Sequence, residues 1–156
     1  MNMNQLKYNL GSGYNYLDGF INVEHPKLKG YCKADEYWDL NKFPYPFKNA
    51  SVIILKEVLE HLNDTVGVMW ECYNMLIKGG ELFITTPYYK HPSAYIDPSH
   101  IRYFTPLSFV VFQKDLVFGV FHQGGNNISD KCKDVNTSIL YDKTLEAQTI
   151  IVKMVK

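Results

Sequence analysis

The feature that most constrains the fold is a Gly-Ser-Gly turn between two short apolar segments near the start of the chain. The first segment covers residues 6–10, the turn residues 11–13, and the second segment, 20–24, ends in Glu24. Glycine lets a backbone approach a ligand closely. An acid at the end of the next strand can accept hydrogen bonds from both hydroxyls of a ribose. The pattern favours a nucleoside-binding site, although a Gly-x-Gly turn also occurs as a plain tight turn.

Only a few residues separate these two segments, and they include the turn pair Asp18-Gly19. A crossover between parallel strands usually contains a helix and needs ten or more residues, so we expect the first crossover helix to be shortened to about one turn or absent. Further strands are expected where apolar runs are bounded by turn residues, with a polar connection at 123–143 before the last strand. The expected strands are 6–10, 20–24, 32–39, 51–55, 81–86, 116–122 and 149–155.

Two helices are expected. The first is capped by Asp64 or Thr65, carries apolar residues at spacings of three and four, and is stopped by Gly79 at the left-handed position after its end. The second begins at Thr105, which is followed by a proline suited to the first helical position, and extends to about Lys114.

With 156 residues the chain suits one domain, 1–156, around a single core. Its 46 % apolar and 21 % charged residues are typical of a soluble globular protein. No apolar run is long enough to span a bilayer and no signal peptide is evident, so we expect a cytoplasmic protein without a membrane partner. The net charge of zero lacks the basic excess of strong nucleic-acid binders. Cys32, Cys72 and Cys132 lie far apart and indicate reduced thiols rather than disulfides.

The order of the later motifs narrows the interpretation. After the glycine turn come Asp-Leu-Asn-Lys-Phe-Pro at 39–44, the β-branched run 52–55, Val-Leu-Glu-His-Leu at 58–62, and a segment at 75–84 with Leu-Ile-Lys-Gly-Gly ahead of its strand. In this order the chain resembles the class I, Rossmann-like S-adenosylmethionine-dependent methyltransferases. It is most similar to the small domains related to the ubiquinone and menaquinone biosynthesis methyltransferases, over residues 6–110.

The resemblance implies a fold and a cofactor. The fold is a single-domain α/β, Rossmann-like, mostly parallel sheet with an antiparallel last strand and a minimal set of helices. The cofactor is S-adenosylmethionine. The methionine part would contact the glycine turn, the ribose would contact Glu24, and the adenine would contact Asp39. The alternatives are that Glu24 is a solvated strand end and that Asp39 is a turn or cap residue. The cofactor-binding residues implied are Leu10, Gly11, Ser12, Gly13, Glu24, Asp39, Leu40, Lys56 and Glu57.

The chemistry asks little of the protein, because the sulfonium carries its own leaving group and the protein aligns a nucleophile with the methyl. An oxygen or nitrogen nucleophile often needs a base as well. The catalytic candidates are His61, in a Glu-His pair common in the resembled family, and Tyr88, His91 and His100, in the loop after the fifth expected strand. His61 could instead only pack or cap a helix. No metal site is expected, because no two histidines are four residues apart and scattered histidines rarely converge.

Several functions stay open. The leading interpretation is methyl transfer to an oxygen or nitrogen atom of an unidentified acceptor, with a small molecule or a glycan-like acceptor favoured. A nucleic-acid methyltransferase is the alternative: the Asp-Pro-Pro-Tyr type of motif is missing at 55–58, but the aromatic-rich loop could stack a flipped base. A second alternative is a non-catalytic cofactor-binding or scaffold domain.

An NAD-linked oxidoreductase fits less well, because its third glycine and its full first helix are missing. The missing helix leaves two options for the pocket. Either it is open and suits a large substrate, or a second subunit completes it in a homodimer.

Overall fold

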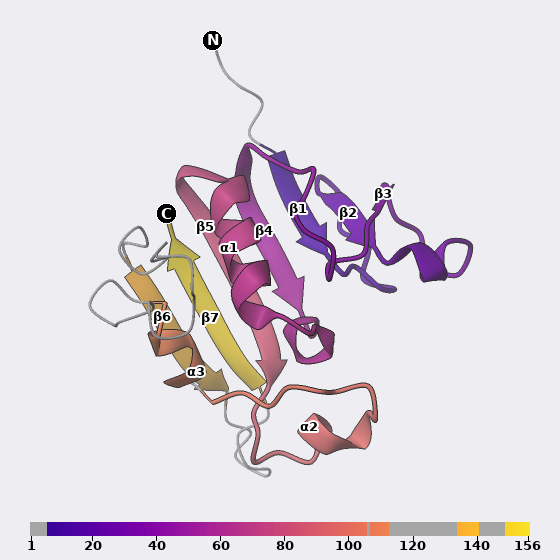
Figure 1. Ribbon diagram of the computed structural model, residues 1–156. Coiled ribbons are helices and arrows are strands. Elements are labelled where there is room, and N and C mark those ends of the chain that lie inside the picture. The colour runs from indigo at the N-terminus through magenta and orange to yellow at the C-terminus, as the bar shows by residue number, and fades with distance from the viewer. Residues whose placement is uncertain (1–5, 106, 113–133, 141–148) are drawn as a thin grey trace.

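The computed structural model describes residues 6–105, 107–112, 134–140 and 149–156 (Figure 1). In this part of the chain seven strands form one sheet in the order β3-β2-β1-β4-β5-β7-β6. The strands are β1 (Leu6–Leu10), β2 (Ile21–Glu24), β3 (Glu36–Tyr37), β4 (Ala50–Lys56), β5 (Leu76–Pro87), β6 (Asp134–Leu140) and β7 (Thr149–Val155).

Strands β1 to β5 are paired in parallel, whereas β7 is antiparallel to both β5 and β6. Strand β4, with the apolar run Val-Ile-Ile-Leu at 52–55, lies between β1 and β5, and its Ile53 and Leu55 are fully buried. A strand covered on both faces needs such a run. The expected fold, a mostly parallel Rossmann-like sheet with an antiparallel last strand, is confirmed.

The chain changes direction across the sheet between β1 and β4. From β1 it adds β2 and β3 on one side, and then it crosses back to place β4 and β5 on the other. Leu10, the last residue of β1, pairs with Val23 in β2 and with Leu55 in β4, so three strand ends meet at this point. In open parallel sheets the crevice beyond such a switch point is where ligands bind.

The helix set is small, as expected. Helix α1 (Thr65–Met75) crosses the face of β4 and β5 (Figure 1) and buries Val68, Met69 and Cys72. Residues 11–20 contain turns and no helix, so the expected loss of the first crossover helix is confirmed. The other helical segments in the described residues are one turn long: η1 (Pro26–Leu28), η2 (Leu59–His61), α2 (Ser93–Ile96) and α3 (Leu107–Val110). No helix among the described residues has the length and apolar character needed to cross a membrane.

An irregular aromatic segment, residues 43–47, packs beside the first strands. Phe47 lies 5.5 Å from the ring of Tyr8 in β1 and 6.4 Å from Trp38, measured between ring centres. Tyr45 is buried, and its hydroxyl donates a hydrogen bond of 2.7 Å to the Leu40 carbonyl. Prolines at 44 and 46 cannot donate backbone hydrogen bonds and exclude a helix here, and the segment is irregular, with bends at 42–44 and 46. Aromatic side chains therefore cover β1 in a region where a helix cannot form.

The end of α1 differs from the expectation. The helix was expected to stop at Gly79, but it ends at Met75, and β5 begins at Leu76 rather than at residue 81. The pairing of β5 with β4 jumps from Ala50–Leu76 to Val52–Glu81, so residues 77–80 form a bulge. A side chain on Gly80 would come within 2.9 Å of the Ala50 carbonyl oxygen, so Gly80 permits a close strand contact. Gly79, the expected helix cap, has its left-handed conformation (φ +80°) inside β5 instead.

Three other boundaries need correction. The third strand is reduced from 32–39 to Glu36–Tyr37, and α3 ends at Val110 instead of about Lys114. The partner of β7 is β6, Asp134–Leu140, which lies inside the stretch 123–143 that was expected to be a polar connection. The β-branched residues at 135, 137 and 139 alternate within that polar stretch, and this alternation was the overlooked strand signal. The strand expected at 116–122 lies outside the described residues.

The N-cap of α1 gives a direct stability prediction. The Asp64 carboxylate accepts a hydrogen bond of 2.8 Å from the Gly67 backbone N–H. Asp64→Ala removes this cap and should lower the free energy of unfolding by about 1 kcal/mol, measured by urea denaturation. Thr65→Ala, which changes the first helical residue and no cap bond, is the control and should stay within ~0.5 kcal/mol of the parent. Equal losses in both variants would contradict the assignment of the cap.

Candidate functional site

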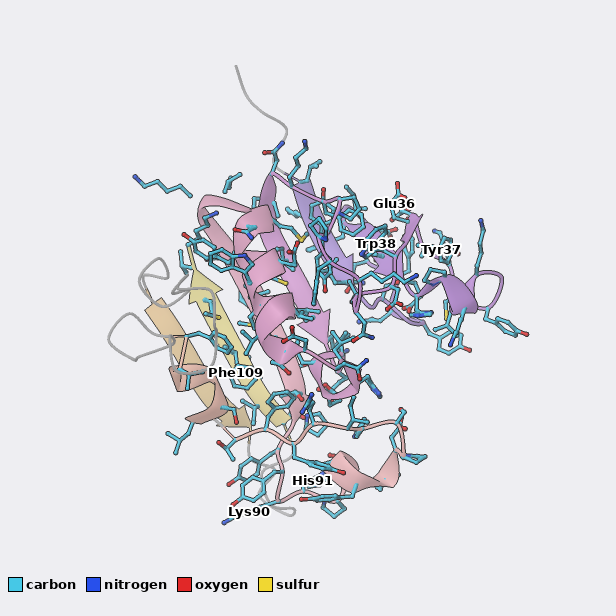
Figure 2. All side chains as sticks on the ribbon, in the orientation of Figure 1. Glu36, Tyr37, Trp38, Lys90, His91 and Phe109 are labelled. Atoms are coloured by element: carbon cyan, nitrogen blue, oxygen red, sulfur yellow. The ribbon has the colours of Figure 1, made fainter. Side chains whose placement is uncertain are left out.

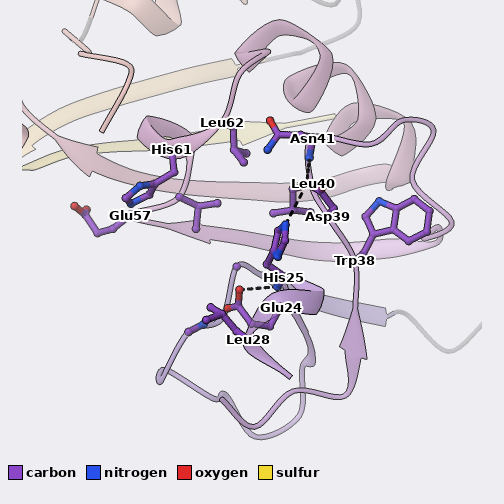
Figure 3. Close-up of a pocket in the computed structure, with 13 residues that line it drawn as sticks. Glu24, His25, Leu28, Trp38, Asp39, Leu40, Asn41, Glu57, His61 and Leu62 are labelled. Carbon is purple, nitrogen blue, oxygen red and sulfur yellow. Dashed lines mark hydrogen bonds and ion pairs between the residues drawn. The ribbon is translucent and has the colours of Figure 1, made fainter. Parts of the chain in front are cut away.

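A cavity of about 380 Å³ opens beyond the carboxyl ends of β1, β2 and β4 (Figure 3). Its volume is in the range of small-molecule sites, roughly 300–1,000 Å³. The wall is mostly apolar, with carboxylates and histidines placed within it. The residues that line it are Gly11, Gly13, Glu24, His25, Leu28, Trp38, Asp39, Leu40, Asn41, Glu57, Val58, His61 and Leu62.

The floor of the cavity depends on the glycine turn. Gly11 has a φ of +69°, and a Cβ built there would lie 2.6 Å from Cγ2 of Val58. Its backbone N–H and that of Ser12 both donate to the Val23 carbonyl, at 2.8 and 3.0 Å. Gly13 also has a positive φ, +52°, but a Cβ there would meet nothing within 4 Å. Position 11 therefore requires glycine because a side chain would clash with Val58 and because its φ is positive. Position 13 has room for a side chain and only the conformational requirement.

Glu24 is held in place by backbone donors. It is buried at the end of β2, and its carboxylate accepts hydrogen bonds from the N–H groups of Gly13 and of His25, the latter at 2.6 Å. An ionised carboxylate has about four acceptor positions. Two remain for a ligand in the cavity, so Glu24 is both a brace for the turn and a free acceptor.

The wall opposite the glycine turn is built by a tight turn after β3. Oδ1 of Asp39 accepts from the Asn41 N–H at 3.0 Å and lies 3.7 Å from Nε2 of His25 (Figure 3). The indole N–H of Trp38 donates to the Lys42 carbonyl at 3.1 Å. Asp39 thus forms the turn that its residue type favours and also lines the cavity, so its place in the turn leaves it accessible to a ligand.

Glu57 marks a strained end of β4. It is not a glycine, yet its φ is +54°, and its N–H donates to the Thr85 carbonyl at 2.9 Å. A left-handed conformation of this kind costs on the order of 1–3 kcal/mol and often occurs at functional sites. The strain turns the chain sharply after β4 and brings Val58 over the glycine turn.

The cofactor-binding residues expected from the sequence divide into two groups. Leu10 is a fully buried core residue, Lys56 is exposed at the end of β4, and Ser12 is buried with a hydroxyl that has no hydrogen-bond partner among the described residues. None of these three lines the cavity. The expected residues that do line it are Gly11, Gly13, Glu24, Asp39, Leu40 and Glu57.

The catalytic candidates His61 and His100 lie together. Their ring centres are 4.7 Å apart, with the ring planes at 69°. The histidines were expected to stay scattered, and for this pair the expectation is wrong. The reason is that the loop after β5 folds back on η2: the N–H groups of Ile101 and Arg102 both donate to the Glu60 carbonyl, at 2.9 and 3.1 Å.

The side chain of Glu60 completes this cluster. It is only 1 % exposed, and one carboxylate oxygen accepts from the Thr86 hydroxyl at 3.0 Å. The other oxygen is buried without a hydrogen-bond partner among the described residues. Burial, and the negative charge of Glu57 as a further contribution, raise the pKa of Glu60 to about 7. A carboxyl group that titrates near neutrality beside a cavity is a typical sign of a functional site.

The other two catalytic candidates do not line the cavity. His91 pairs through Nδ1 with the Ser93 hydroxyl at 2.7 Å and lies beside α2 (Figure 2). Tyr88 forms a bridge with Phe104 and packs its ring against that of Tyr89, with ring centres 5.1 Å apart. Both residues therefore belong to the framework of the loop after β5.

Sequence reasoning missed several cavity residues. Trp38 and His25 directly adjoin residues that were predicted, and Val58 follows Glu57. Their position next to predicted residues in the sequence was the signal that could have identified them, because neighbouring residues at the end of a strand often face the same space. The unpredicted lining residues are His25, Leu28, Trp38, Asn41, Val58 and Leu62.

Comparison with solved structures identifies the fold. A SAM-dependent methyltransferase of Archaeoglobus fulgidus superposes with a TM-score of 0.67 at 15 % identity, with 97 % of this chain and 86 % of that chain covered. A SAM-dependent methyltransferase of Thermotoga maritima gives 0.66 at 11 % identity, with 97 % and 81 % covered. No protein-family model and no curated protein matches the chain.

A larger enzyme matches only in part. Phosphoethanolamine N-methyltransferase 2 of Haemonchus contortus, solved with S-adenosyl-L-methionine, gives a TM-score of 0.62 at 11 % identity. All of this chain is covered, but only 49 % of that chain. Together the comparisons show that the chain has the class I fold of SAM-dependent methyltransferases, as its sequence resemblance implied.

The contact between Gly11 and Val58 can be tested by stability. Gly11→Ala combines a left-handed conformation with a steric clash and should lower the free energy of unfolding by about 3 kcal/mol. Gly13→Ala has the same conformational cost without the clash and should lose only about 1 kcal/mol. The double variant Gly11→Ala, Val58→Ala should lose less free energy of unfolding than the sum of the losses in the two single variants. Strict additivity in the double variant would contradict the contact.

Proposed function

We propose that the cavity binds S-adenosylmethionine and that the protein transfers its methyl group to an oxygen or nitrogen atom of an acceptor. A small or glycan-like acceptor is favoured, since the chain has no excess positive charge. The observation that carries the proposal is the place of Glu24. Its carboxylate, with acceptor positions to spare, stands beside the glycine turn at the switch point of a class I methyltransferase fold.

The residues present fit this cofactor. The open space over Gly13 leaves room beside the turn for the methionine part. Glu24 would accept from the ribose hydroxyls. Asp39 and the backbone of Leu40 would meet the adenine against the ring of Trp38. We place the sulfonium near Glu57, whose negative charge favours a cation.

The methyl donor, when bound, supplies the leaving group, so the protein has to orient an acceptor and remove its proton. His61 lines the cavity and is in ring contact with His100. We therefore place the acceptor at the Glu57–His61 end of the cavity, with the His61–His100 cluster as the group that handles its proton. Tyr88 and His91 receive no role in this proposal, because neither lines the cavity.

One observation favours a nucleic-acid acceptor as the second candidate. Tyr95 and Tyr103 are stacked with ring centres 4.9 Å apart, and both are about half exposed on the loop after β5. Exposed aromatic rings beside an open site can stack a base. Acceptor screening should therefore include single-stranded DNA and RNA beside glycans and small molecules. Methylation of nucleic acid that is lost in Tyr103→Ala would favour this second candidate.

The cofactor assignment is tested by calorimetric titration with S-adenosylmethionine and with its demethylated product, with NAD as a negative control. Glu24→Gln removes the charge and one strong acceptor pair, which is worth roughly 1.5–3 kcal/mol. We expect its affinity for both ligands to fall by about tenfold or more.

The matched control is Glu36→Gln, which neutralises an exposed carboxylate on neighbouring β3 that lies outside the cavity wall. Its affinity should equal that of the parent. Thermal unfolding of both variants checks that the fold is intact. Equal affinity in Glu24→Gln would contradict the ribose assignment, and no binding by the parent would favour the scaffold interpretation.

A further inference from the structure

The cluster of Glu60, His61 and His100 holds three ligand-type atoms in close range. One ring nitrogen of each histidine and a Glu60 carboxylate oxygen all lie within 4.8 Å of one another. Glu60 and His61 belong to η2, directly after β4, whereas His100 comes from the loop after β5. The backbone bonds from that loop to the Glu60 carbonyl fix the two segments together.

The hydrogen bond of His100 identifies its free nitrogen. Nδ1 of His100 lies 3.1 Å from the Ala94 carbonyl oxygen, which can only accept a hydrogen bond. Nδ1 therefore carries the proton in the neutral ring. Nε2 of His100 is left with a lone pair.

The same reasoning applies to His61 through a chain of two hydrogen bonds. The Ser99 hydroxyl donates its single hydrogen to the Asp97 carboxylate at 2.6 Å, and this bond lowers the pKa of Asp97. Toward Nδ1 of His61, at 3.0 Å, the hydroxyl can then only accept. Nδ1 of His61 is therefore the protonated nitrogen, and its Nε2 also has a lone pair.

One ring nitrogen of each histidine and one Glu60 oxygen thus lie within 4.8 Å of one another. The hydrogen bonds described above leave a lone pair on each Nε2, and one Glu60 oxygen is buried without a hydrogen-bond partner among the described residues. Buried polar atoms rarely remain unsatisfied in folded proteins. A group of this kind needs a cation or a proton at its centre.

We propose that Glu60, His61 and His100 bind a divalent transition-metal ion. Two imidazoles and one carboxylate form a ligand set used for Zn²⁺ and Fe²⁺ and leave coordination positions open. Mg²⁺, which prefers an all-oxygen shell and keeps several waters, fits this set poorly. The bonds from Nδ1 of each histidine to Ala94 and to Ser99 are the outer contacts that orient metal-binding imidazoles.

The position of the ion suggests what it would do, and this part rests on the proposed function. His61 lines the cavity, so the ion would lie at the cavity edge, where the acceptor is placed. An open coordination position would hold the acceptor hydroxyl and lower its pKa, so that its proton leaves to solvent. With Nε2 on the ion, His61 and His100 would act as ligands in place of the direct proton-accepting role given above. The substrate class that follows is a hydroxyl-bearing acceptor, with methyl transfer to oxygen.

Metal binding is measured first on the whole protein after removal of metal with a chelator, without S-adenosylmethionine. Calorimetry should give one saturable site for Zn²⁺ and none for Mg²⁺ in the same range. Co²⁺ should develop the visible absorption of a nitrogen-coordinated ion. His61→Ala and His100→Ala should each weaken Zn²⁺ binding by at least about tenfold, and Ser99→Ala, which loses only an outer contact, by about tenfold.

The matched control is His91→Ala, a histidine of the same loop whose ring pairs with Ser93 outside the cluster. It should bind Zn²⁺ like the parent. Because Glu60 is buried, Glu60→Gln is interpreted only if its thermal unfolding matches that of the parent. If it does not, the variants at His61 and His100, which are partly exposed, and at the exposed Ser99 test the proposal.

Two results would overturn the proposal. Zn²⁺ binding that survives in the double variant His61→Ala, His100→Ala would place the ion elsewhere on the chain. Absence of saturable Zn²⁺ and Co²⁺ binding would mean that a shared proton holds the cluster together. Since this titration contains no S-adenosylmethionine, its failure leaves the proposed cofactor site standing, and failure of cofactor binding leaves the metal site standing.

Discussion

The left-handed turn of Gly11 against Val58 is the contact on which the site depends. It packs the residue that follows β1 against the residue that follows the strained Glu57 after β4. The same turn is bound to β2 through the Val23 carbonyl and through the Glu24 carboxylate. Three strand ends are therefore tied together at the switch point of the sheet. The cavity is the space that this arrangement leaves open above them.

A buried network of hydrogen bonds stabilises the connection between β1 and β2, where a crossover helix is usually found. Asn22, in β2, is fully buried and bonds through its amide to the Leu17 backbone N–H and carbonyl, at 2.9 and 3.0 Å. It also accepts from the Asn9 amide at 2.9 Å and donates to the Asp35 carboxylate at 3.0 Å. Backbone groups that a helix would satisfy internally are satisfied here by side chains. This explains how ten residues can connect two parallel strands without a helix.

The interpretation from sequence succeeded where a local signal decides the local conformation. The β-branched run at 51–55, the cap at Asp64 and the short distance between the first two strands each act within a few residues. The site residues Glu24 and Asp39 could be placed because parallel strands end at a common edge.

The interpretation from sequence was wrong where contacts between segments that are distant in the sequence determine the local structure. Residues 77–80 join β5 because the Ala50 region of β4 pairs with Leu76, and a glycine pair alone does not reveal this pairing. His61 and His100 come from different crossovers, so their approach depends on how the loop after β5 folds back onto Glu60. The spacing of histidines in the sequence carries no information about such a contact. The loss of a full crossover helix, in contrast, could be predicted, because the few residues between the first two strands leave room for about one turn at most.

A crystal structure of the protein with the demethylated cofactor would show whether the switch-point cavity is the cofactor site. We expect the ribose hydroxyls within hydrogen-bond distance of the Glu24 carboxylate, with the adenine between Leu40 and Trp38 and the thioether directed toward Glu57 and His61. A ligand bound elsewhere, or a cavity that stays without ligand at saturating concentration, would contradict the assignment and leave this chain as a methyltransferase fold that does not use its cofactor pocket.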